Sequence, residues 1–240
     1  YQIKPIGVVV PRTREDVVSA IQIAADEEVA ILPRGAGTSQ CGQTVGQALV
    51  IDTSTYLNKT VALDTTARTV RVEPGIVLDH LNRELAAHGL MFPVDVSTAA
   101  QATIGGMAGN NSCGARSIRY GTMRDNVLNI SAILSTGERH SFGGVTPNGP
   151  HGTLENALLE IGISEAQEIQ RRFPKVQRRV GGYNVDSLIP PPDGSTLNLA
   201  HLLVGSEGTL AFSEEIELKL VGVPKHKVLG VCHFPTFYAA

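Results

Sequence analysis

Residues 103–116 read Thr103-Ile-Gly-Gly-Met-Ala-Gly-Asn-Asn-Ser-Cys-Gly-Ala-Arg116, and the rest of the chain can be interpreted around this stretch. Five glycines fall within the seventeen residues from Gly105 to Gly121. Each glycine adds to the entropy lost when the chain orders, so packing alone rarely accounts for such a segment. Its usual benefit is close approach of bare backbone N–H groups to anionic or carbonyl oxygens. Ile104, Met107 and Tyr120 interrupt the polar run, which favours a packed cofactor cradle over a flexible surface loop.

The composition is that of a globular protein. The 240 residues can form one large domain or two small ones, and the apolar content is 42%. A net charge of −3, with no basic run longer than a pair, disfavours nucleic-acid binding. No apolar run approaches the roughly 20 residues that a membrane helix needs, and no signal peptide opens the chain. Three widely spaced cysteines argue against a disulfide framework, a zinc site or an iron–sulfur site in this chain, and indicate a reducing, cytoplasmic location.

The first fifty residues predict a parallel βαβ unit. Val8–Val10 and Val29–Leu32 are short β-branched or apolar runs, and Thr13 can cap a helix between them. Leu49–Asp52 predicts a third strand.

The loop from Pro33 to Gly46 is a second glycine-rich element. It follows a strand, at the end where ligands of open α/β sheets collect. Its glycines and hydroxyl side chains suit a pyrophosphate, although the spacing is neither the dinucleotide fingerprint nor a P-loop, and a structural wide turn remains an equal alternative. Arg34 is either a phosphate partner or a surface ion-pair residue.

The remaining pattern predicts an antiparallel hairpin, strands and helices. We expect strands at 61–64, 69–73, 127–134, 140–142 and 216–220, helices at 76–88 and 154–173 (with a break near Gly162), a loop at 143–152, and the start of another strand at 228–234. His80, Glu84 and His88 share a helical face, which indicates a solvated stripe rather than a metal site.

Leu202-Leu-Val-Gly-Ser-Glu-Gly-Thr-Leu210 is the third glycine element. Glu207 has two candidate roles, as a turn-stabilising carboxylate or as a group that orients the ring or ribose of a cofactor. No serine, cysteine or histidine nucleophile set is indicated.

Three separated motifs together resemble one family. Pro33-Arg-Gly-Ala-Gly-Thr-Ser39, the 103–126 segment with Arg119-Tyr-Gly-Thr-Met-Arg-Asp125, and Val204-Gly-Ser-Glu-Gly-Thr-Leu210 resemble the FAD-binding domain of the D-2-hydroxyacid dehydrogenases. These belong to the vanillyl-alcohol-oxidase (PCMH-type) flavoproteins and include glycolate, D-lactate and D-2-hydroxyglutarate types. The resemblance covers nearly the whole chain.

The resemblance implies an α+β fold of two subdomains with FAD between them. A small N-terminal α/β subdomain would span 1–60, and a larger one, with a mainly antiparallel sheet and flanking helices, would span 61–225. Residues 226–240 would begin a C-terminal substrate domain. By the same resemblance, the cofactor contacts would be Arg34, Gly35, Ala36, Gly37, Thr38, Ser39, Gly42, Gln43, Pro93, Asp95, Ser97, Thr103, Gly105, Gly106, Asn110, Ser112, Gly114, Gly121, Glu207, Gly208 and Ile216.

The implied activity is oxidation of a 2-hydroxy acid to a 2-oxo acid, with hydride transfer to FAD. The loop lacks the histidine to which some relatives attach flavin, so we expect non-covalent FAD, and we expect no catalytic residue or metal ligand in this chain. The expected partners are the small 2-hydroxy acid, the C-terminal substrate domain and an iron–sulfur domain or subunit, and the whole protein can lie at the cytoplasmic face of a membrane. Alternative functions are a non-catalytic electron-transfer module and a sugar or alcohol oxidase of the same superfamily.

Overall fold

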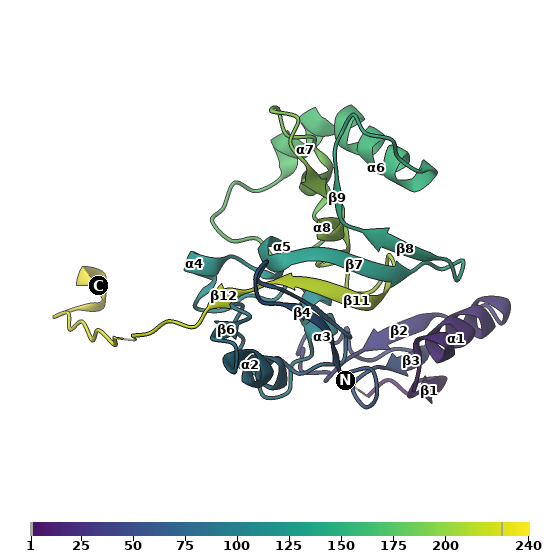
Figure 1. Cartoon of the computed structure of the whole chain (residues 1–240), viewed down its shortest axis with the longest axis horizontal. Coiled ribbons are helices and arrows are strands. Elements are labelled where there is room, and N and C mark those ends of the chain that lie inside the picture. The colour runs from purple at the N-terminus through teal and green to yellow at the C-terminus, as the bar shows by residue number, and fades with distance from the viewer. Residues whose placement is uncertain (1, 227) are drawn as a thin grey trace.

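The computed structural model describes residues 2–226 and 228–240. It contains a three-stranded parallel sheet, a five-stranded antiparallel sheet and a helical lobe beside the second sheet (Figure 1). This arrangement confirms the predicted fold class of an α/β layer joined to a larger, mainly antiparallel unit.

The parallel sheet lies near the N-terminus. It has the order β1 (Gly7–Val9), β3 (Leu49–Asp52), β2 (Ile31–Arg34), so the helix α1 (Arg14–Asp26) crosses over from β1 to β2. Thr13 and Asp16 form a capping box that fixes the start of α1. The buried face of α1 packs on β3. The βαβ prediction is therefore confirmed, with β2 starting two residues later than expected.

The antiparallel sheet carries the larger core. Its order is β4 (Thr60–Asp64), β5 (Thr69–Val72), β11 (Phe212–Lys219), β7 (Val127–Ile133), β8 (Arg139–Phe142). The chain's last long strand, β11, thus lies between two strands that precede it by many residues. The helix α2 (Leu78–Ala86) buries Leu78, Leu81 and Leu85 in the same core.

The glycine-rich stretch and the ten residues after it, 103–126, form three short helices. These are α3 (Ile104–Gly109), α4 (Ser117–Tyr120) and α5 (Met123–Asn126). Ile104 and Met107 bury their side chains, which confirms the packed path.

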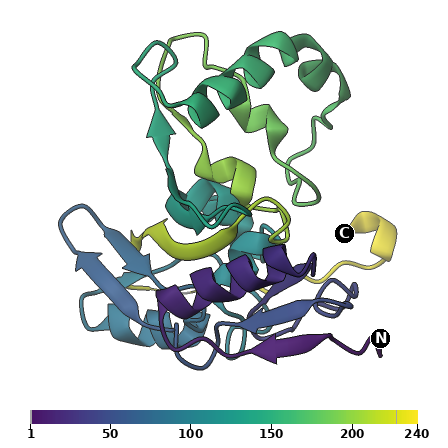
Figure 2. The same ribbon diagram turned by 90° about the vertical axis from the view of Figure 1, so that its right-hand side faces the viewer.

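A lobe of residues 144–203 stands above the antiparallel sheet in both views (Figures 1 and 2). Its elements are β9 (Gly144–Val145), α6 (Thr153–Ser164), α7 (Ala166–Arg172), the 3-10 turn η1 (Val185–Leu188), β10 (Leu197–Asn198) and α8 (Ala200–Leu203). The chain enters and leaves through β9 and β10, which pair with each other.

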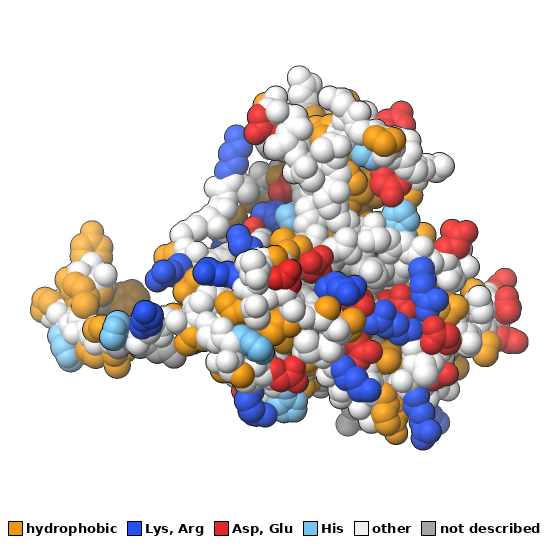
Figure 3. All heavy atoms as spheres, viewed as in Figure 1, with side chains coloured by type: hydrophobic (Ala, Val, Ile, Leu, Met, Phe, Trp, Pro, Cys, Tyr) orange, Lys and Arg blue, Asp and Glu red, His pale blue; other side chains and the backbone are white. Residues whose placement is uncertain are grey.

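Three local predictions were wrong. The loop expected at 143–152 contains β9. The helical break occurs at Glu165 instead of Gly162, because Gly162 is needed for packing: a Cβ there would lie 1.9 Å from the carbonyl oxygen of Leu188. No strand forms within the described residues 228–236, since this tail extends away from the body and finds no partner strand (Figure 3).

The other short elements are β6 (Leu90–Met91), which pairs with β12 (Val221–Gly222), and the 3-10 turn η2 (Phe237–Ala239). No helix in the described part of the chain is long and apolar enough to cross a membrane. The proposed boundaries at residues 60 and 225 stay predictions.

Candidate cofactor cradle

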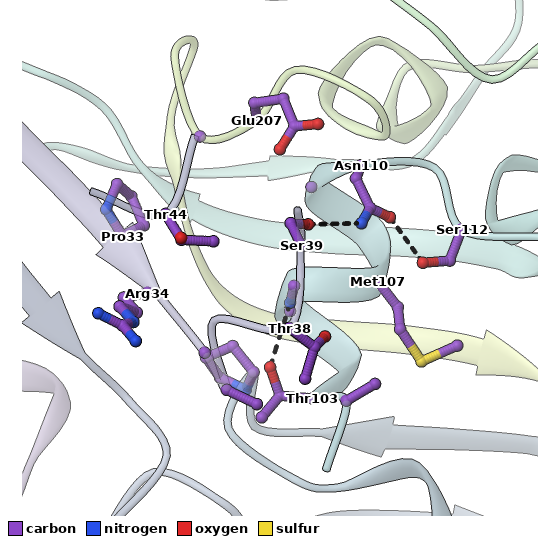
Figure 4. A pocket seen from close by; sticks show the side chains of 18 of the residues that line it. Pro33, Arg34, Thr38, Ser39, Thr44, Thr103, Met107, Asn110, Ser112 and Glu207 are labelled. Carbon is purple, nitrogen blue, oxygen red and sulfur yellow. Dashed lines mark hydrogen bonds between the residues drawn. The ribbon is translucent and has the colours of Figure 1, made fainter. Parts of the chain in front are cut away.

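A cavity of about 370 Å³ opens between three segments that are distant in the sequence (Figure 4). The first wall is the loop from Pro33 to Thr44, the second is Thr103–Cys113 at and after α3, and the third is Leu203–Ser213. Its volume lies within the usual range for small-molecule sites.

The first wall offers unused backbone donors. Among the described residues, no N–H group from Gly35 to Thr44 donates a hydrogen bond to the protein. Of the described lining residues, Arg34 is the only basic one; it forms no ion pair within the described chain, and its buried Nε lacks a partner. A run of free amides beside an uncompensated guanidinium suits an anionic group such as a diphosphate.

The second wall does not supply the bare amides that its glycines suggest. The first four N–H groups of α3 are bonded within the protein, to Ile76 O, Pro74 O, Thr103 Oγ1 and Thr103 O. The expectation of free amides at the start of this stretch was therefore wrong, because the segment folds into a capped helix. The free amides lie on the first wall.

The glycines of α3 have two distinct roles. A Cβ on Gly105 would lie 2.6 Å from Pro74 Cβ, so this glycine is required by protein packing. A Cβ on Gly106 would approach only Thr103 Oγ1, at 3.2 Å, and one on Gly109 would meet nothing closer than 3.9 Å. Gly109 therefore leaves open space on a cavity wall that a bound group can use, whereas a Cβ on Gly106 would already require a small shift of the Thr103 side chain.

Polar side chains connect the first two walls. Asn110 Nδ2 donates to Ser39 Oγ at 3.5 Å, and Ser112 Oγ donates to Asn110 Oδ1 at 2.6 Å (Figure 4). Gly35 of the first wall also packs directly against Thr103 of the second wall, so closely that a Cβ on Gly35 would lie 1.9 Å from Thr103 Oγ1.

The third wall carries Glu207, the only acidic residue among the described lining residues. It adopts φ 54°, between Gly205 at φ 88° and Gly208 at φ 76°, so the loop turns sharply here. Its N–H donates to Gly109 O at 2.9 Å. Burial raises the pKa of the Glu207 carboxyl, and the neighbouring amide of Gln43 partly opposes that rise.

Most of the predicted contact residues line the cavity. They are Arg34, Gly35, Ala36, Gly37, Thr38, Ser39, Gln43, Ser97, Thr103, Gly105, Gly106, Asn110, Ser112, Glu207 and Gly208. Those outside its lining are Gly42, Pro93, Asp95, Gly114, Gly121 and Ile216.

Two of the residues outside the lining have clear structural roles. The side chain of Ile216 is 0% exposed in the core of the antiparallel sheet, so the predicted contact with adenosine would have to come from its backbone. Gly114 allows close packing, because a Cβ there would lie 2.0 Å from Asp95 O.

Several lining residues escaped prediction. Thr44 and Thr98 directly follow predicted residues and could have been included by extending the motifs. Cys113, between the predicted Ser112 and Gly114, could have been included in the same way. Ser213 carries no such signal; β11 reaches the cavity only because the strand is inserted in the middle of the sheet.

Comparison with known proteins agrees with this geometry. The family model described as an FAD binding domain matches residues 5–143. The chain is 32% identical to a D-2-hydroxyglutarate dehydrogenase of Pseudomonas putida, over 100% of this chain and 25% of that protein. It is 32% identical to a mitochondrial cytochrome-dependent D-lactate dehydrogenase of Arabidopsis thaliana, over 97% of this chain and 33% of that protein.

A solved structure shares the fold. An alkyldihydroxyacetonephosphate synthase aligns with a TM-score of 0.62 and 22% identity, over 91% of this chain and 34% of that one. The chain thus spans about a quarter to a third of the length of these relatives. The family match covers more than half of the chain and includes the first two walls of the cavity, so this protein belongs to the FAD-binding domain family of PCMH-type flavoproteins.

Proposed function

We propose that this chain is the FAD-binding part of a flavin-dependent dehydrogenase that oxidises a 2-hydroxy acid to a 2-oxo acid. The observation that carries the proposal is the run of amides from Gly35 to Thr44 that donate no bond within the described chain, in a cavity whose second wall is the glycine-rich helix α3. The names of the relatives, D-2-hydroxyglutarate and D-lactate dehydrogenases, support the substrate class.

The residues of this chain bind and orient; the bound FAD supplies the acceptor for the hydride. The amides of the first wall and Arg34 would hold the diphosphate, since they form the cationic side of the cavity. Gly106 and Gly109 would allow the cofactor to lie directly against the backbone of α3. Asn110, Ser112 and Glu207 would fix its polar edges.

The first experiment is to measure the visible absorbance of the purified protein, followed by acid precipitation and identification of released flavin. We expect one equivalent of FAD in the supernatant, because no histidine lies in the loop from Pro33 to Gly46 to bind it covalently. Flavin retained in the pellet would refute non-covalent binding. A protein that takes up no added FAD would refute the proposed function.

Gly106→Val tests the second wall. A branched side chain would fill the space against α3, so we expect loss of FAD binding with the melting temperature of the apoprotein nearly retained. Flavin fluorescence titration and thermal melting measure the two effects. Unchanged FAD affinity would remove Gly106 from the site.

Two matched variants separate the roles of the glycines. Gly46→Val is the control, because a Cβ there meets nothing within 4 Å and Gly46 does not line the cavity; we expect normal FAD binding. Gly105→Val should lower the melting temperature of the apoprotein, since its Cβ would collide with Pro74.

We propose further that, in the whole protein, this domain works with a substrate-binding domain and an iron–sulfur domain or subunit. The length of the relatives supports additional parts. We also propose a cytoplasmic location, free or at the inner face of the membrane. Fractionation of native cells, with and without a high-salt wash, distinguishes the two.

A further inference from the structure

A network of polar side chains lies behind the cavity and does not line it. Its members are Asn111, Arg124, Asn184 and Asp186, and Asn111 and Asn184 are 0% and 1% exposed. Buried polar side chains are costly unless they are bonded. Asn184 is bonded at both ends of its amide and Asn111 only at Oδ1, since its buried Nδ2 has no partner in the described chain; these bonds join the segments that carry the two residues.

Arg124 is the centre of this polar network. Its backbone N–H donates to Asn111 Oδ1 at 3.0 Å. Its Nη1 donates to Asn184 Oδ1 at 3.3 Å and to Asp186 Oδ2 at 3.2 Å. Arg179 donates to the other oxygen of Asp186, which anchors that carboxylate.

Asn111, at one end of the polar network, adjoins the second wall of the cavity. Asn111 follows directly on Asn110, which lines the cavity and bonds to Ser39. Asn111 adopts φ 52°, an uncommon conformation for a residue other than glycine, and its bond with the Arg124 backbone helps to hold it. A shift at Asn111 would therefore move Asn110.

Asn184, at the other end of the polar network, adjoins the third wall. Asn184 Nδ2 donates to Val204 O at 2.7 Å, just before the turn that presents Glu207. The lobe backbone also packs there: a Cβ on Gly205 would lie 3.0 Å from Gly182 O. Asn184 thus holds the base of the Gly205–Gly208 turn.

We propose that Arg124, acting through Asn111 and Asn184, is a positioning residue that sets the placement of the second and third cavity walls relative to each other. This inference rests on the proposed FAD binding. Arg124 touches no part of the cavity, so it acts on the cofactor only through the two walls. The lobe, which contributes Asn184 and Asp186, thereby supports the cofactor site.

The test begins with Arg124→Met, which keeps the length of the side chain and removes the guanidinium bonds to Asn184 and Asp186; the backbone N–H that bonds Asn111 remains, so the variant tests the link to the third wall. We expect FAD to bind about tenfold more weakly, an ordinary size for coupling between a binding site and a residue that acts on it through other residues. Bound flavin should also show a visible band with less vibrational structure, because the walls enclose it less closely. FAD titration and the absorption spectrum measure these changes; wild-type affinity would overturn the proposal.

A double-mutant cycle with Asn184→Ala then tests the path. If both residues act through the same polar network, the FAD affinity of the double variant should lie within about threefold of that of the single variant with the lower affinity. Losses that multiply would overturn the proposal, because they would show that the two residues act independently.

Control variants exclude a general effect on stability. Arg171→Met removes an exposed ion pair on α7, and Leu159→Ala removes a buried side chain of the lobe; neither side chain is hydrogen-bonded to the polar network. We expect wild-type FAD affinity from both, even where Leu159→Ala melts at a lower temperature. Weaker FAD binding by Leu159→Ala, to the extent seen with Arg124→Met, would overturn the specific role of Arg124.

Milder variants keep the test valid if Arg124→Met does not fold. Arg124→Lys and Asp186→Asn each retain part of the network, and each should weaken FAD binding while the protein stays folded. Wild-type affinity in both would overturn the inference. Failure of the wild-type protein to bind FAD would instead refute the proposed function.

Discussion

At the scale of single residues, Glu207 makes the stability of the fold depend on pH. Its pKa is raised by burial, so between the ordinary and the raised value the folded protein binds more protons than the unfolded chain does. Stability therefore falls as the pH rises through that interval, which begins near the ordinary pKa of about 4.3. Above the raised pKa the penalty is complete and constant.

Glu207→Gln removes this titration. We expect the variant and the wild type to melt at similar temperatures near pH 4. As the pH rises toward 7, the melting temperature of the variant should rise above that of the wild type. Thermal melts of the apoprotein across this range measure the difference. Parallel curves would contradict the assignment of the penalty to Glu207.

The glycines show what a sequence pattern can predict about a cavity and what it cannot. Their density marked three segments that line one cavity in the structure. Their individual roles could not be predicted, since these depend on which atom faces each glycine: Pro74 faces Gly105, whereas open space faces Gly109. That information exists only once distant segments have come together.

At the scale of elements, an ionic contact joins α1 to the antiparallel sheet. Glu215, in β11, accepts from Arg14 of α1 at 2.7 Å and from Arg71 of β5 at 2.9 Å. Its side chain is 9% exposed, and a β-bulge just before it interrupts the strand alternation. The contact lies close to Ser213, which lines the cavity, so it helps to hold the parallel layer against the cofactor site.

Glu215→Gln should lower the free energy of unfolding by about 1–2 kcal/mol, between the values for exposed and buried pairs, because both arginines are partly exposed. Glu168→Gln, which removes only exposed pairs on α7, is the matched control and should lower the free energy of unfolding by less than Glu215→Gln does. Urea unfolding measures both. Equal losses would show that burial of Glu215 adds nothing.

The elements themselves were largely predictable. Periodicity and capping located α1, α2 and the β4–β5 hairpin, because those signals are local. The two-residue strands β9 and β10 were not predictable, since each is defined only by its pairing with the other.

At the scale of the whole molecule, the order of the antiparallel sheet has a consequence for synthesis. The family match ends at residue 143, yet β11, from residues 212–219, separates β5 from β7. While the chain is being made, the β4–β5 and β7–β8 hairpins therefore emerge with their edges unpaired, and the lobe must be completed before they can join. Such long-range closure slows folding and leaves the nascent chain open to mispairing, so a truncated 1–143 fragment would aggregate and would depend on chaperones in a way that the complete domain would not.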